Sequence, residues 1–128
     1  MKNELILNLE NKIHGFHTRL KELHFAAPSV SIHKIIDDFD GELLEFDDEI
    51  MEEAQSLFDF ILPGEIKPVL PESLEIEDLL QEIRGTLAGF LEAIEDSRMM
   101  TGIKSETESF WHTLNKTIYL IRIAKKGE

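Results

Sequence analysis

The sequence predicts an all-α protein that folds as a single four-helix bundle. The chain has 128 residues, which is enough for one hydrophobic core and too few for two. Apolar residues make up 42% of the chain and charged residues 30%, the proportions of an ordinary folded domain. In four separate segments the apolar residues recur every three or four positions, the period of one helical face, and no alternating strand pattern competes with them. We therefore expect one domain over residues 1–128.

The first two predicted helices form a hairpin. They span about residues 2–27 and 30–62, each with apolar residues along one face. Pro28 and Ser29 separate them, and Ser29 is a candidate N-cap for the second helix. So few connecting residues predict that the two helices run antiparallel. Pro63-Gly64 is expected to end the second helix.

The last two predicted helices span about residues 73–101 and 105–125. Gly102 is a candidate stop for the third helix, and Ser105 with Glu108 forms a capping-box pattern for the fourth. The connection in the middle of the chain, about a dozen residues, is the longest. This order predicts two antiparallel helical hairpins joined by one longer crossover. A simple up-and-down bundle is the alternative, because so short a crossover can only just run the length of a helix.

Negative charge is concentrated in one stretch of the chain. The formal net charge is −13, and residues 35–66 hold twelve acidic residues and no Lys or Arg. Nucleic-acid binding needs basic surface, so this composition argues against it and favours cations as partners. The lack of cysteine excludes disulfides and thiolate metal sites. With no signal-peptide pattern and no apolar run of membrane-spanning length, we expect a soluble cytoplasmic protein with no membrane partner.

The acidic stretch contains a polar stripe on the second predicted helix. At 100° per residue, four polar residues fall within about a quarter turn of one another. They are His33, Asp37, Asp48 and Glu52. The apolar stripe of the same helix is centred about 150° away, so the polar stripe points away from the core of its own chain.

Apolar residues lie on the same outer side of this helix, at Leu44, Met51 and Phe58. A helix that is apolar on two sides is usually buried on two sides, and another subunit is the simplest cover for the second side. Imidazole nitrogen and carboxylate oxygens are ligands that suit Fe(II), Mn(II) or Zn(II). We therefore expect a divalent metal at a subunit interface, with His24 near the hairpin turn as a further ligand.

The spacing of these ligands is itself informative. After His33, an Asp follows four residues on, another Asp fifteen on and a Glu nineteen on. The stretch from Leu23 to Glu52 thereby resembles the Dps-like family of the ferritin-like superfamily, whose ferroxidase ligands have this spacing. The earlier His of the family's His-Trp pair corresponds to His24, although Phe25 stands where the family has Trp.

The resemblance implies a ferritin-like fold and a ferroxidase centre built across a two-fold subunit interface. One chain would supply His24, His33 and Asp37, and its mate would supply Asp48 and Glu52. The implied activity is oxidation of Fe(II), bound singly or as a pair, by peroxide or oxygen. The family stores the ferric product in a hollow shell that usually has twelve subunits. Because the chain has no Lys-rich tail, DNA compaction is not expected.

Two other hypotheses remain open from the sequence. In the first, the chain is a non-enzymatic interaction protein that has the ferritin-like fold without the metal chemistry, and its acidic residues form a solvated or interface surface. Alternatively it is a dimeric di-metal protein with another chemistry, such as peroxide handling. Among the remaining histidines, we expect His17 to be structural and His14 and His112 to lie at the surface.

Overall fold

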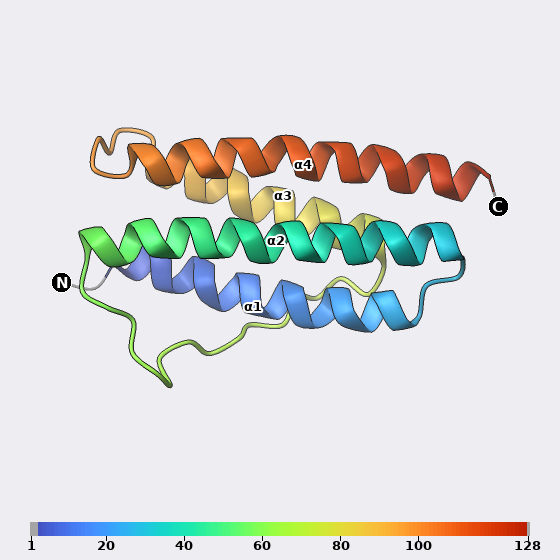
Figure 1. Ribbon diagram of the computed structural model, residues 1–128, viewed down its shortest axis with the longest axis horizontal. Coiled ribbons are helices and arrows are strands. Elements are labelled where there is room, and N and C mark those ends of the chain that lie inside the picture. Colours follow the sequence, from blue (N-terminus) through green and yellow to red (C-terminus); the bar gives the residue numbers. More distant parts are fainter. Residues whose placement is uncertain (1–2, 128) are drawn as a thin grey trace.

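The computed structural model describes residues 3–127 and consists of helices joined by loops (Figure 1). The four helices are α1 (Glu4–Phe25), α2 (Val30–Leu57), α3 (Ile76–Ala93) and α4 (Thr101–Lys126). Within residues 3–127 there is no strand, so the prediction of an all-α chain with four helices is confirmed. In this range no helix is both long enough and apolar enough to cross a lipid bilayer.

Each helix packs against two neighbours around a common core. Both α1 and α4 pack against α2 and also against α3, so α1 lies diagonally opposite α4. The connection from α2 to α3, residues 58–75, is called the crossover below. Figure 1 shows it running back along the bundle, so that α3 starts near the end where α2 starts. As a result α1 and α2 are antiparallel, and so are α3 and α4.

Apolar residues from all four helices fill the centre of the bundle, as the periodicity predicts. The stripe of α2 from Ile32 to Ile50 is buried. The Phe110 ring of α4 stacks on two rings of α2, with centroids 5.6 Å from Phe39 and 4.5 Å from Phe46. Aromatic pairs of this kind add about 1 kcal/mol each beyond the area they bury. They tie α2 to α4 on the side of α2 away from α1.

The start of α2 is as predicted, but its end is not. The Ser29 side chain caps α2 by accepting a hydrogen bond from the Ile32 N–H. The helix ends at Leu57, five residues before the predicted end at position 62, and Phe58 is already extended. Phe58 and Ile61 pack against the core from the extended chain. Burial of these two apolar side chains therefore favours an early end to the helix.

The predicted end of α3 and the predicted start of α4 were both wrong. α3 ends at Ala93 instead of near position 101, and α4 begins at Thr101 instead of near position 105. Gly102 is consequently inside the first turn of α4 and does not stop α3. Ser105 and Glu108 lie within α4, so they do not form a capping box.

Two buried side chains explain this early break. Ile94 and Met100, at the two ends of the connection, are both buried in the core. A continuous α3 could not place both of them inward, so the chain turns between them. The Ser97 hydroxyl accepts a hydrogen bond from the Met100 N–H and closes the turn. Burial of the connection thus overrides the helical preference of the sequence.

The crossover is held against α1 by hydrogen bonds to the backbone. The Asn11 side chain accepts a hydrogen bond from the Lys67 N–H, and the Asn11 carbonyl accepts one from the Val69 N–H. Further along α1, the Arg19 guanidinium donates to the Ser73 carbonyl. The crossover therefore covers one side of α1 and leaves the outer face of α2 uncovered in the single chain.

Gly15 permits this close approach, since a Cβ at position 15 would overlap the carbonyl of Val69. We expect Gly15→Ala to lower the free energy of unfolding by about 2 kcal/mol, because the crossover must move away from α1. Gly89→Ala is the matched control, as Gly89 is an exposed helical glycine with no atom within 4 Å of the added Cβ. This change should stabilise by up to about 1 kcal/mol. Urea denaturation followed by circular dichroism measures both, and equal effects would contradict the tight contact.

Candidate metal centres

The structure separates the five predicted ligands into two groups. His24, His33 and Asp37 lie near the hairpin turn between α1 and α2. Asp48 and Glu52 are exposed further along α2. His33 and Asp48 are fifteen residues apart, which corresponds to about 22 Å of helix. The two groups therefore cannot bind one metal ion within a single chain.

The two histidines of the first group are in contact. The ring centroids of His24 and His33 are 3.8 Å apart, with an angle of 31° between the rings. The His33 Nδ1 lies 3.0 Å from the backbone carbonyl oxygen of His24, and it must donate because a carbonyl only accepts. This hydrogen bond leaves the lone pair on His33 Nε2. Metal-binding histidines are commonly oriented in this way, with the second ring N–H on a backbone carbonyl.

The other histidine has a free nitrogen. His24 Nδ1 is buried and has no hydrogen-bond partner among residues 3–127. It lies 3.9 Å from Asp37 Oδ1, too far for a hydrogen bond. His24, His33 and Asp37 thus bring two imidazoles and one carboxylate to the same end of the hairpin. These three residues do not form a tight cluster. Among residues 3–127, one trio of side chains has ligand atoms that all lie within 4.8 Å of one another, and it lies elsewhere.

The second group belongs to an acidic groove between α2 and α4. The groove has a volume of about 490 Å³, and its lining includes six carboxylates. They come from Glu42, Glu45, Asp48, Glu49, Glu52 and Glu106. Clustered carboxylates at a partly enclosed surface raise the local concentration of cations. This groove is the part of the molecule where the acidic stretch of the sequence is most concentrated.

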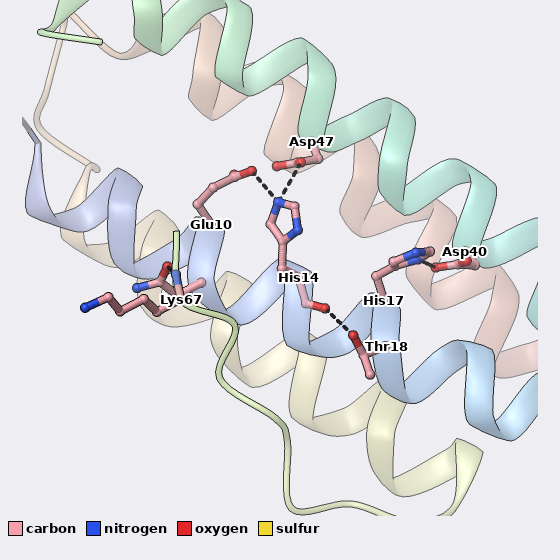
Figure 2. A network of polar contacts seen from close by, with 8 residues as sticks. Glu10, His14, His17, Thr18, Asp40, Asp47 and Lys67 are labelled. Atoms are coloured by element: carbon pink, nitrogen blue, oxygen red, sulfur yellow. Dashed lines mark hydrogen bonds and ion pairs between the residues drawn. The ribbon is translucent and has the colours of Figure 1, made fainter. Parts of the chain in front are cut away.

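A third group, which the sequence analysis missed, lies at the middle of the α1–α2 contact (Figure 2). His14 Nε2 is 3.2 Å from Glu10 Oε1 and 3.9 Å from Asp47 Oδ2. These are the three residues whose ligand atoms lie within 4.8 Å of one another. The Glu10 side chain is only 3% exposed, whereas that of His14 is 39% exposed. His14, expected at the surface, is therefore half-buried and engaged with two carboxyl groups.

Burial strongly perturbs the two carboxyl groups. The pKa of Glu10 is raised from the ordinary 4.5 to about 10, mainly by burial and in addition by the neighbouring Asp47 and Asp48. Burial also raises the pKa of Asp47. With both groups ionised, Glu10 Oε2 and Asp47 Oδ1 are buried without a hydrogen-bond partner. A proton held by Glu10 at neutral pH can be shared with the carboxylate of Asp47.

The polar contacts between α1 and α2 repeat along the hairpin. His17 Nδ1 lies 2.7 Å from Asp40 Oδ1, so His17 is paired in the structural role expected for it. A step of seven residues along α1 matches a step of seven back along α2 at each contact. The three pairs are Glu10 with Asp47, His17 with Asp40, and His24 with His33. We call this row of pairs the polar seam.

The four-residue spacing of Glu10 and His14 on α1 could have drawn attention to the missed group, because it places both side chains on one helical face. The partner Asp47 could be identified only from the register of the hairpin. Comparison of the chain with protein-family models, curated proteins and solved structures found no match. Functional assignment therefore depends on these residues alone.

The perturbed Glu10 gives a pH prediction. Its folded pKa, about 10, exceeds the ordinary 4.5, so between these values the folded state holds a proton that the unfolded state has lost. The contribution of Glu10 to stability is then fully present below about pH 4.5 and is lost as pH rises toward about 10. In chelator-containing buffer, we expect the free energy of unfolding to fall by about 2 kcal/mol from about pH 7.5 to 9.5.

Glu10→Gln should remove most of this loss, since the amide has a similar shape and does not titrate in this range. Urea denaturation at several pH values compares the two proteins. Parallel pH profiles for the wild type and Glu10→Gln would show that Glu10 does not carry the extra proton.

Proposed function

We propose that the protein is a Dps-like subunit of the ferritin-like type, which binds Fe(II) and oxidises it at a centre shared by two chains. The single observation that carries this proposal is the His24–His33 contact. One ring donates from Nδ1 to a backbone carbonyl and so keeps its lone pair on Nε2, and the other has an unpartnered nitrogen 3.9 Å from Asp37. Imidazole nitrogens and a carboxylate suit Fe(II) well.

The positions of the remaining ligands support a two-fold arrangement. In an antiparallel pair of α2 helices, an axis passing between Gly41 and Leu44 would place His33 opposite Glu52 of the partner subunit. The same axis would place Asp37 opposite Asp48 of the partner subunit. The two ligand pairs have the same midpoint along α2, so one two-fold axis brings both pairs together. This alignment of the two helices follows from the residue numbers alone.

The surface near that axis suits a helix–helix contact. Gly41 is exposed, and no atom lies within 4 Å of where its Cβ would be, so a second helix could approach closely. Leu44 is also exposed. Near the histidines, Phe25 and Val30 are 79% and 84% exposed, an unfavourable state for apolar side chains that a partner would relieve. A two-fold dimer is therefore the smallest assembly we propose, and a twelve-subunit shell follows from the family resemblance.

Iron is the substrate of the proposed reaction. Two Fe(II) ions give one electron each to a peroxide molecule, which takes up two protons and leaves as two water molecules. The histidines and Asp37 of one chain, with Asp48 and Glu52 of the partner subunit, would hold the ions during this transfer. Carboxylate oxygens bind iron in both oxidation states, and the acidic groove beside Asp48 would attract incoming Fe(II).

A second candidate is a helical-bundle interaction protein without metal chemistry. The loose arrangement of His24, His33 and Asp37 in the single chain favours it. On this hypothesis the exposed acids only repel one another. Asp48→Asn or Glu52→Gln would then raise the stability of the protein and leave metal uptake unchanged.

Aerobic Fe(II) titration followed by absorbance near 300 nm tests the proposal. We expect the wild type to oxidise Fe(II) faster than buffer does, and His33→Gln or Glu52→Gln to lower the rate at least about tenfold. His112→Gln, at an exposed histidine of α4, is the matched control and should leave the rate unchanged. Oxidation no faster than in buffer would reject the function.

Mixing the two inactive variants tests whether the centre is shared. A dimer of one His33→Gln chain and one Glu52→Gln chain has one centre with both defects and one centre with none. We expect such mixed dimers to recover about half of the wild-type rate per dimer, as each dimer has two centres by symmetry. No recovery in dimers verified by mass in solution would contradict the two-fold arrangement.

A further inference from the structure

The polar seam contains a cluster of three ligand residues that differs in position and construction from the proposed ferroxidase centre. Glu10 and His14 are one helical turn apart on α1, and Asp47 faces them from α2. From these contacts we infer that Glu10, His14 and Asp47 form a binding site, complete within one chain, for a divalent first-row transition metal ion. The inferred ion joins α1 to α2 at the middle of the hairpin.

The distances suit a single ion. Ligand atoms about 2.1 Å from a transition metal lie about 3.0 to 4.2 Å from one another. His14 Nε2 is 3.2 Å from Glu10 Oε1 and 3.9 Å from Asp47 Oδ2, both within that range. Small side-chain rotations are then enough to close the three ligands on an ion, and the helices need not move.

An independent observation also indicates a cation. The Glu10 side chain is 3% exposed, and its Oε2 atom is buried without a hydrogen-bond partner. Asp47 Oδ1 is in the same condition. Figure 2 shows the two carboxylates converging on the His14 ring. A buried carboxylate oxygen without a donor is costly, and a cation held between the two carboxylates would compensate the negative charge that they bury.

The nature of the ligands selects the class of ion. One imidazole nitrogen with two carboxylate oxygens suits Mn(II), Fe(II), Co(II) or Zn(II), whereas Mg(II) and Ca(II) prefer oxygen ligands throughout. The half-exposed His14 leaves an open side for entry and for water ligands. His14 is ten residues from His24 on α1, about 15 Å along the helix. The site is thus distinct from the proposed ferroxidase centre.

Co(II) binding to a double variant tests the inference. The protein with both His33→Gln and Glu52→Gln lacks the proposed shared centre and retains the three seam ligands. Anaerobic titration with Co(II), followed by its visible absorption, should show one ion per chain bound with a Kd below about 0.1 mM. Adding Glu10→Gln or His14→Gln should weaken binding at least about tenfold, because each removes a direct ligand. His17→Gln, a seam variant outside the three ligands, should leave the Kd unchanged.

Thermal unfolding gives a second readout that does not depend on the spectrum. Co(II) should raise the Tm of the double variant, since the ion binds only the folded hairpin, and His14→Gln should abolish that rise. His14→Gln also serves if Glu10→Gln does not fold, because His14 is half-exposed. A Kd above about 1 mM, no rise in Tm, or an unchanged Kd in His14→Gln would each overturn the inference and leave a proton-sharing pair. Fe(II) oxidation by the shared centre can fail without affecting these results.

Discussion

The register of the α1–α2 hairpin is the constraint on which the other features of this molecule depend. Polar pairs recur in the polar seam every two helical turns, amid an otherwise apolar contact. If α1 slid by one turn against α2, buried carboxylates such as Glu10 and Asp40 would lose their partners, at a cost of several kcal/mol. Apolar packing alone would tolerate such a slip better, because apolar residues recur about once per turn on each helix and would meet new apolar partners. The polar seam therefore fixes where every side chain on the outer face of α2 stands relative to α1.

The acidic stretch has two roles, divided by the geometry of one helix. Asp40 and Asp47 face α1, are buried, and contact histidines. Asp48, one residue after Asp47, is turned by 100° and stays exposed with Glu52. The excess of negative charge is thus partly structural and partly available to ligands. This division explains why a single α2 helix could take part in one site within its own chain and another between chains.

The sequence predicted most of the fold because apolar periodicity and the Ser29 cap act locally. It did not predict the α3–α4 connection, where burial of Ile94 and Met100 breaks a continuous helical pattern. For the candidate sites, a helical wheel of α2 correctly placed Asp48 outward. It could not find the contact of His14 with Asp47, because that contact depends on how two helices are aligned. When each helix is considered separately, both His14 and Asp47 resemble ordinary surface residues.

The path of the crossover also bears on the order in which the protein folds. The hydrogen bond from Lys67 to Asn11 joins residues 56 positions apart, whereas the polar seam joins residues brought close by a tight turn. Contacts between distant positions form slowly, since closing a long loop costs chain entropy before any contact repays it. The α1–α2 hairpin is thus suited to nucleate folding. We expect the crossover to pack against α1 later in folding, and this step then fixes the topology of the two hairpins.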